Sequence, residues 1–382
     1  MQFNGPDGQE DMPYLLTPGP VTTSRGVKVA MLADWGSRDG EFTSLVKKIR
    51  RELLRLAGCN DNYDCVIMQG SGTFAMEAAL GSLAPRKRKK TLVLANGAYG
   101  ERAAKILEKL DRPFERISLS DTTPLQPSHF THVLDADSSL THVWLVHCET
   151  TSGIVNPLGD LAREVKSRGR LLMVDAMSSF GALDINMPRD GIDVLISSAN
   201  KCIEGVPGFS FVILKKDLLV ACEGNSHSIV MDLFEQWRTM EETGQFRFTP
   251  PTHALVAFQQ ALMELEEEGG PSARLKRYKH NADTLISGLT KLGLVPLLTA
   301  TEVSPVVQTF MTPRDANFVF SDFAARVHKR GFVIYPGKLT LSSSFRIGTI
   351  GQLTGDVMDR VVTAVREVLM EMNVRDMMPR DL

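Results

Sequence analysis

Residues 171–208 read LLMVDAMSSFGALDINMPRDGIDVLISSANKCIEGVPG, and this stretch decides the fold. It holds two apolar runs, residues 171–174 and 194–196, that have the composition of buried parallel strands. The first run ends on Asp175, and the second is followed by a small polar patch and then Lys201. In open α/β sheets, ligands bind beside the carboxyl ends of the strands. We therefore expect an acid and an amine to face one site.

An acid and an amine in Gly- and Ser-rich surroundings match the needs of a pyridoxal phosphate enzyme, namely a lysine for the Schiff base and an acid that keeps the pyridinium nitrogen protonated. Taken singly, Asp175 is more often a turn-former or helix cap, and Lys201 a solvated surface group. The surroundings of Lys201 favour the functional interpretation, because four small or polar residues precede it and Gly205, Pro207 and Gly208 follow. An amine that is partly desolvated in such a loop becomes a usable nucleophile. We predict Lys201 and Asp175 as catalytic residues.

A Gly-rich turn at Ser71, Gly72 and Thr73 follows a short apolar strand and precedes a predicted helix. This arrangement presents free backbone amides and the positive end of a helix dipole to an anion. Serine and threonine also cap helices that bind nothing. In combination with the acid and the amine, we expect these three residues to bind the cofactor phosphate.

Apolar runs and helical patterns alternate along the chain. Strands are predicted at residues 65–68, 91–95, 114–119, 142–147, 171–174, 194–196, 209–214, 306–310, 332–335 and 344–347, and helices at 41–56, from about 74, up to about 110, and at 159–168, 254–267, 274–292, 318–330 and 356–372. Strands separated by helices, with polar residues at the strand ends, specify an α/β fold with a mostly parallel sheet covered on both faces. Residues 209–214 are expected to close this sheet.

The length of 382 residues predicts two domains of unequal size. We place an N-terminal arm and substrate loop at residues 1–25, with the first dozen residues disordered or arm-like, a large domain at 26–270 and a smaller α+β domain at 271–382. A net charge of −2 argues against nucleic-acid binding, and five cysteines without a paired spacing fit free thiols in a reducing compartment rather than a metal site. The polar N-terminus and the absence of long apolar runs predict a cytoplasmic protein without membrane contact.

Several motifs make the chain, from about residue 14 to its end, similar to the class V aminotransferases of the fold-type I pyridoxal phosphate family. They are LLTPGPV (15–21), SGT (71–73), HCETTSG (147–153), NKCIEGVPG (200–208), RFTPPTH (247–253), GFVIYPGK (331–338) and FRIGTIG (345–351). This resemblance implies a large domain with a mostly parallel seven-stranded sheet flanked by helices, a smaller α+β domain, pyridoxal 5'-phosphate as cofactor, and a homodimer with shared active sites. Within the family, the chain resembles the members that transfer an amino group from 2-aminoethylphosphonate to pyruvate.

The resemblance also implies further cofactor contacts. Tyr99 would lie against the pyridine ring, Ser198 would belong to the polar patch before the lysine, and Thr252 of the neighbouring subunit would complete the phosphate site. The hydroxyl of Thr150 or Thr151, at the end of the strand at 142–147, could donate to the ring oxygen or its surroundings, and we favour Thr150. For Tyr99 the alternative is an ordinary packed tyrosine, and for Thr252 it is the cap of the helix at 254–267.

Two substrate contacts are implied as well. Gly19, in the loop LLTPGP, would reach the substrate region, and Arg346 would hold the carboxylate of the 2-oxo acid, a task that suits a planar guanidinium. A lone arginine on a strand is otherwise more often a surface ion pair. One position departs from the family pattern: His227 stands where relatives commonly carry arginine, so binding of the phosphonate would be weaker or pH-dependent if that position contributes.

Three other interpretations stay open at this point. An alanine–glyoxylate or serine–pyruvate aminotransferase would share all the cofactor residues. A class V desulfurase needs a nucleophilic cysteine on a mobile loop, and Cys202, next to Lys201, is poorly placed for that. A degenerate cofactor-binding or regulatory protein of the same fold is disfavoured, because Asp175, Lys201 and Arg346 occur together.

Overall fold

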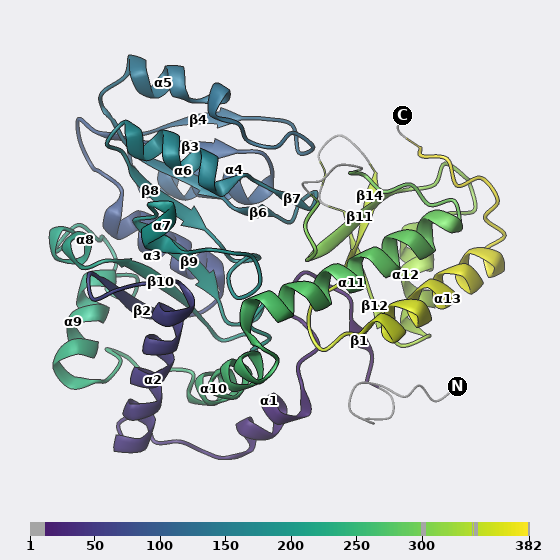
Figure 1. Ribbon diagram of the computed structural model, residues 1–382, viewed down its shortest axis with the longest axis horizontal. Coiled ribbons are helices and arrows are strands. Elements are labelled where there is room, and N and C mark those ends of the chain that lie inside the picture. Colours follow the sequence, from purple (N-terminus) through teal and green to yellow (C-terminus); the bar gives the residue numbers. More distant parts are fainter. Residues whose placement is uncertain (1–11, 299–302, 338, 340–342, 381–382) are drawn as a thin grey trace.

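A seven-stranded sheet forms the centre of the computed structural model, which describes residues 12–298, 303–337, 339 and 343–380 (Figure 1). In spatial order the strands are β2 (Tyr63–Gln69), β10 (Phe209–Lys215), β9 (Val194–Ser198), β8 (Leu171–Asp175), β5 (Leu140–Val146), β3 (Lys90–Ala95) and β4 (Phe114–Ser118). The pairs from β9 to β4 are parallel, and β10 is antiparallel to both of its neighbours. The predicted mostly parallel seven-stranded sheet is therefore confirmed.

The expectation that residues 209–214 close the sheet is wrong. β10 lies between β9 and β2, and it pairs with β2 along its whole length, from Phe209 opposite Gln69 to Lys215 opposite Tyr63. The edges are β2 and β4. A strand covered by helices on both faces and paired on both sides is apolar throughout, so the composition of β10 could not indicate which neighbours it would have.

Helices cover both faces of this sheet, because successive side chains of each strand point to opposite sides. On β8, Leu172 and Val174 pack into one apolar cluster and Met173 packs into the other. The first cluster includes α2 (Gly40–Leu56), α6 (Leu158–Ser167) and α10 (Thr252–Glu267), and the second includes α3 (Gly72–Leu83), α4 (Ala98–Lys109) and α9 (Leu233–Thr243).

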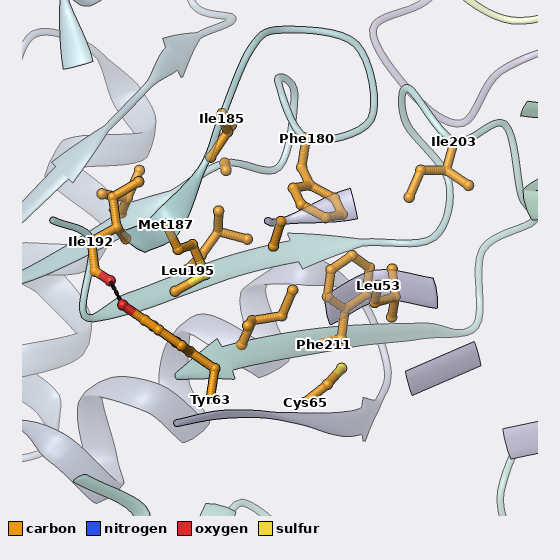
Figure 2. Close-up of a cluster of buried hydrophobic side chains, with 14 of the residues drawn as sticks. Leu53, Tyr63, Cys65, Phe180, Ile185, Met187, Ile192, Leu195, Ile203 and Phe211 are labelled. Atoms are coloured by element: carbon orange, nitrogen blue, oxygen red, sulfur yellow. Dashed lines mark hydrogen bonds between the residues drawn. The ribbon is translucent and has the colours of Figure 1, made fainter. Parts of the chain in front are cut away.

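Figure 2 shows part of the first cluster, where Phe180 and Phe211 meet edge to face with ring centroids 5.6 Å apart. The Tyr63 hydroxyl donates to the carbonyl oxygen of Ile192 at 3.4 Å and so satisfies a polar atom at the end of this core. The shorter elements around the large sheet are α1 (Arg25–Val29), the 3-10 turns η2 (Ala30–Leu32) and η3 (Pro127–His129), α5 (Thr131–Ala136), β6 (Cys148–Glu149), β7 (Ile154–Val155), α7 (Met187–Asp190) and α8 (Lys216–Ala221).

A second, smaller body is built on a three-stranded sheet of order β11-β14-β13. Its elements are β11 (Val307–Met311), β14 (Ser344–Gly348), β13 (Tyr335–Pro336), α11 (Gly270–Lys291), α12 (Phe320–His328) and α13 (Gly355–Glu371). Figure 1 shows α11 as the long helix that runs from the large sheet's side of the molecule to this body. The strand predicted at 332–335 is divided into β12 (Phe332–Val333) and β13.

The start of the described chain joins this smaller body. β1 (Tyr14–Leu15) pairs in parallel with β12, and Tyr14 stacks on Phe332 with ring centroids 6.1 Å apart. The arm-like state expected for the first dozen residues falls almost wholly on positions 1–11, which lie outside the described residues. The domain boundaries at 25 and 270 stay a prediction. Within the described ranges, no helix has the length and apolar composition to cross a membrane.

Close packing of α4 on the end of β3 depends on a glycine. A Cβ atom on Gly100 would lie 2.7 Å from the Cα atom of Ala95, so α4 would have to move. Gly81, in α3, is a matched control, because a Cβ atom there meets only Leu110 Cδ1, at 3.7 Å.

We expect Gly100→Ala to lower the free energy of unfolding by about 1 to 3 kcal/mol, as overpacking does. Gly81→Ala should be neutral or should raise it by up to about 1 kcal/mol, since alanine is the better helix former. Urea unfolding of both variants measures the difference. Equal effects would mean that α4 does not need this close approach.

Candidate active site

A cavity of about 290 Å³ opens at the carboxyl ends of β8 and β9. Its lining consists of Gly19, Ser71, Gly72, Thr73, Met76, Tyr99, Arg102, Val146, Cys148, Thr150, Asp175, Met177, Ser178, Ser198, Asn200 and Lys201. The cavity thus gathers every site residue expected from the sequence except Thr252 and Arg346, which are described by the structure but do not line it.

Asp175 is the acid of this cavity. It is the last residue of β8, is 2% exposed, and accepts a hydrogen bond from the backbone amide of Met177 at 3.0 Å. Burial raises the pKa of Asp175 to about 7, and the nearby Glu149 carboxylate adds to this effect; the Met177 bond and the charges of Arg102 and Lys201 oppose it. A carboxylate in this environment is stabilised by any cation that binds beside it.

Lys201 lies in the turn that follows β9. Its Nζ donates to the carbonyl oxygen of Pro18 at 2.9 Å, so the predicted substrate loop reaches the amine directly. Gly19, the residue after Pro18, has φ +130°, and a Cβ atom there would lie 2.4 to 2.7 Å from the outer side-chain atoms of Lys201. Only glycine allows both this backbone conformation and this close approach.

The residues predicted to form an anion cradle, 71–73, lie at the start of α3 and line the cavity. Ser71 is the N-cap residue with extended backbone, and in the described structure its side chain makes no capping hydrogen bond. Capping by Ser71 therefore does not explain this residue. A Cβ atom on Gly72 would lie 2.4 Å from Met177 Sδ, so a side chain there would displace Met177, another residue that lines the cavity. Backbone amides at a helix start are suited to a phosphate group.

Arg102 is a cavity residue that the sequence reasoning missed. Its guanidinium lies 4.7 Å from the ring centroid of Tyr99, and its Nη1 donates to Thr73 Oγ1 at 3.0 Å. The signal was present, since Arg102 follows Tyr99 by three residues in α4 and therefore shares its helix face. Arg102 therefore brings a positive charge next to Thr73.

Glu149 anchors the start of α4, and the sequence reasoning missed this role too. Its buried carboxylate accepts hydrogen bonds from the backbone amides of Tyr99 at 3.2 Å and Gly100 at 3.4 Å, and from the Thr151 hydroxyl at 2.6 Å. Burial raises the pKa of Glu149, although these hydrogen bonds oppose the rise. The carboxylate fixes the helix turn that carries Tyr99 and Arg102.

Arg346 is buried next to the cavity wall. It is 2% exposed, with Nη1 donating to the carbonyl oxygen of Thr150 at 2.9 Å and Nε to that of Pro336 at 3.1 Å. It is not a surface ion pair. Burial lowers the pKa of Arg346, while Tyr99 and Glu149 oppose the decrease. Two backbone carbonyls therefore orient the guanidinium beside Thr150, a cavity residue.

Thr252 and His227 lie elsewhere on the chain. Thr252 is the first residue of α10, Pro251 is the N-cap, and no side-chain capping bond is found at this end in the described structure. The alternative of Thr252 as the helix cap is therefore wrong. His227 is exposed in the loop before α9, and it is absent from the described lining of the cavity.

The cavity fits pyridoxal phosphate by the chemistry of its groups. A primary amine, a buried carboxylate, an aromatic ring and a helix start are the groups that this cofactor requires, and they come from four separate segments. Gly19 and Gly72 keep clear the space that side chains would fill. No predicted cofactor residue of the cavity conflicts with this fit in the described chain.

The families and proteins to which this chain is similar include aminotransferases. The family model described as aminotransferase class-V matches residues 28–342. The protein named 2-aminoethylphosphonate--pyruvate transaminase from Rhizobium meliloti (strain 1021) is 51% identical over 95% of this chain and 94% of its own length. The protein of the same name from Pseudomonas aeruginosa is 47% identical over 96% of this chain and 98% of its own length.

Solved structures of the same fold include two aminotransferases. Aspartate aminotransferase from Thermus thermophilus superposes with a TM-score of 0.82 at 26% identity, over 94% of this chain and 99% of its own. Pyridoxamine-pyruvate aminotransferase from Mesorhizobium loti superposes with a TM-score of 0.87 at 22% identity, over 98% of this chain and 96% of its own. With the family model matching most of its length, this chain belongs to the class V aminotransferases.

Proposed function

We propose that this protein transfers the amino group of 2-aminoethylphosphonate to pyruvate, giving phosphonoacetaldehyde and L-alanine, as a step of phosphonate degradation in the cytoplasm. The substrates are taken from the names of relatives about half identical to it over nearly the whole chain. The observation that carries the chemistry is the meeting of Lys201 and Asp175 in one cavity. The cofactor implied by the family is pyridoxal phosphate.

When bound, pyridoxal phosphate supplies an electron sink for the carbon that bears the amino group. In our proposal Asp175 holds the ring nitrogen protonated, and the amides of residues 71–73 hold the phosphate. Lys201 holds the cofactor through its amine and moves the proton at the substrate carbon as general acid and base. Tyr99, Thr150 and Ser198 complete the contacts with the ring.

Substrate binding is assigned to Arg346 and to the loop of Gly19. The guanidinium of Arg346 is oriented by two backbone carbonyls and would grip the carboxylate of pyruvate. The Gly19 loop lies against Lys201 and would exclude water from the amine. His227 does not line the cavity of its own chain, so any role at the phosphonate would be played from a second subunit.

We expect 2-aminoethylphosphonate to be the best amino donor with pyruvate, because it is the donor named for relatives that are about half identical to this chain. The alternative alanine–glyoxylate and serine–pyruvate activities would use the same cofactor residues, so the donor preference distinguishes them. A coupled assay that compares 2-aminoethylphosphonate, alanine and serine at equal concentration measures this preference. A higher kcat/KM for alanine or serine would replace the proposed donor while leaving the chemistry unchanged.

Two variants serve as controls for that assay. Lys201→Ala lacks the amine, and Lys201→Arg keeps a positive charge without a primary amine; both should lose transamination with every donor. Borohydride reduction followed by peptide mass spectrometry should place the cofactor on Lys201 in the wild-type protein alone. Substantial turnover in either variant would remove Lys201 from the mechanism.

For Asp175→Asn we expect turnover to fall strongly while cofactor binding persists, since an amide does not hold the ring nitrogen protonated. Cofactor-free protein gives an independent readout. The folded-state pKa of about 7 exceeds the ordinary value of 3.8, so ionisation of Asp175 as pH rises costs the wild-type fold free energy. The free energy of unfolding of cofactor-free Asp175→Asn should therefore exceed that of the wild-type protein by about 1 to 4 kcal/mol, and the difference should grow as the pH rises from about 5 to about 8.

Urea unfolding of both cofactor-free proteins at the two pH values measures this change. A stability difference that does not grow with pH, together with near-normal turnover, would leave Asp175 as a strand-end turn residue only.

We also propose a homodimer in which Thr252 completes the partner's phosphate site. Two observations support this: Thr252 does not line the described cavity of its own chain, and its side chain does not cap α10 there. A threonine hydroxyl at the first turn of a helix can donate to a phosphate group.

Thr252→Ala should weaken cofactor binding by roughly 1.5 to 3 kcal/mol, the value of a hydrogen bond to a charged group, whereas Thr252→Ser should keep the hydroxyl and the affinity. Mixing Thr252→Ala with Lys201→Ala chains at subsaturating cofactor should restore part of the activity, because one site of a mixed dimer holds Lys201 and Thr252 together. Exchanged chains that regain nothing, or an active monomer in sedimentation, would contradict the shared site.

A further inference from the structure

The turn that follows Lys201 is held by a buried cluster of polar groups. The amide of Glu204 donates to the carbonyl oxygen of Lys201 at 2.8 Å, which closes the turn. Glu204 has φ +65°, a left-handed conformation that is unfavourable for a residue other than glycine, and it is 1% exposed. A strained and buried carboxylate persists only where its surroundings determine it.

Those surroundings come from the start of α11. Arg277 Nη2 donates to Glu204 Oε1 at 2.9 Å, and the Tyr278 hydroxyl donates to the same oxygen at 2.5 Å. Arg274 Nη1 donates to the carbonyl oxygen of Cys202 at 2.9 Å. Arg274 and Tyr278 are both fully buried, so these contacts form inside the protein rather than at its surface.

The same helix face binds a turn of the smaller body, residues 349–353. Arg277 Nη1 donates to the carbonyl oxygen of Gly351 at 2.6 Å, and Asn281 Nδ2 donates to those of Thr349 at 3.1 Å and Leu353 at 2.9 Å. Residues 274, 277, 278 and 281 recur at spacings of three and four, which places them on one side of α11.

Glu204 itself contacts this second turn. Its Oε2 accepts a hydrogen bond from Gln352 Nε2 at 2.8 Å. The second turn directly follows β14, the strand that carries Arg346. One carboxylate is therefore bonded both to the turn of the amine and to the segment after the guanidinium.

The loop of Gly19 closes the connection from the other side. The backbone amide of Gln352 donates to the carbonyl oxygen of Thr22 at 2.8 Å. The backbone amide of Gly348 donates to the carbonyl oxygen of Leu16 at 2.9 Å. Pro18, within this loop, accepts from Lys201 Nζ. Both the backbone and the side chain of Lys201 are thus connected to residues 348–352.

We propose that Glu204 is a positioning residue that keeps the amine of Lys201 in register with the carboxylate grip of Arg346. A 2-oxo acid has its carboxylate next to the carbon that reacts, so one molecule must meet both groups at once. The proposal rests on the proposed function in this one respect, that Lys201 and Arg346 act on the same substrate.

Glu204→Gln is the test variant, because the amide has nearly the same shape but loses the charge that Arg277 binds. Glu268→Gln is the matched control. Glu268 accepts from Arg274 Nε at 2.5 Å and Arg277 Nε at 2.8 Å, yet it bonds to neither turn in the described structure. Arg274 Nη1 also lies 3.6 Å from Glu204 Oε1, so both changes remove one negative charge from the same two arginines.

Hydrogen exchange on the cofactor-free proteins tests the coupling without any assumption about the reaction. In Glu204→Gln we expect the amides of Glu204 and Gln352, in two different turns, to exchange about 10-fold faster or more, as loss of a charge-assisted hydrogen bond implies. In Glu268→Gln neither should change by more than about twofold. Faster exchange at Glu204 alone, or equal effects in both variants, would overturn the proposal.

Kinetics of the cofactor-loaded proteins test the consequence. Glu204→Gln should lower kcat/KM for pyruvate by about 10-fold, mostly through KM, whereas hydroxylamine, which offers no anion to Arg346, should react with the loaded protein within about twofold of wild type. A parallel loss with both reagents would indicate general damage and would overturn the positioning role. A wild-type protein without transaminase activity would instead refute the proposed function, and the exchange result would stand apart from it.

Discussion

The burial of Asp175 is the constraint on which the site depends. An ionised carboxylate removed from water is costly unless it is paired or hydrogen-bonded, and here a single backbone amide, that of Met177, donates to it among the described residues. The raised pKa is the sign of that cost. A cation bound beside Asp175 would relieve that cost, so the same burial that destabilises the ionised acid favours a positively charged ligand group in the cavity.

This cost is offset by the core on both sides of β8. Leu172, Met173 and Val174 are fully buried between two layers of helices, so the strand has no freedom to move its last residue toward water. The neighbouring β9 is held in the same way and delivers the Lys201 turn. Close packing of the sheet is therefore what keeps an acid and an amine together in a small cavity.

Charges around the cavity are organised in pairs of unequal environment. Glu149 is buried with several donors and anchors a helix, while Asp175 has fewer donors and faces the cavity. Arg102 lies in the cavity on an aromatic face, while Arg346 is held behind the wall by backbone carbonyls. Of the two carboxylates, Glu149 supports the structure and Asp175 is available to a ligand, while both arginines bring positive charge to the site, so one site can use both signs of charge.

The sequence by itself determined the strands of the large sheet, most of the long helices, the mostly parallel pairing, and Asp175, Lys201 and residues 71–73 of the cavity. It could do so because apolar runs that end in Asp175 and precede Lys201 are local signals, and parallel strands bring their carboxyl ends together by geometry alone. Tertiary structure decided what depends on contacts between distant segments: the internal place of β10, the pairing of β1 with β12, and the burial of Arg346. The same holds for Glu204, whose partners lie about 70 and 150 residues further along the chain. No local pattern records such partners, because the energy that selects them is gained only when the fold is complete.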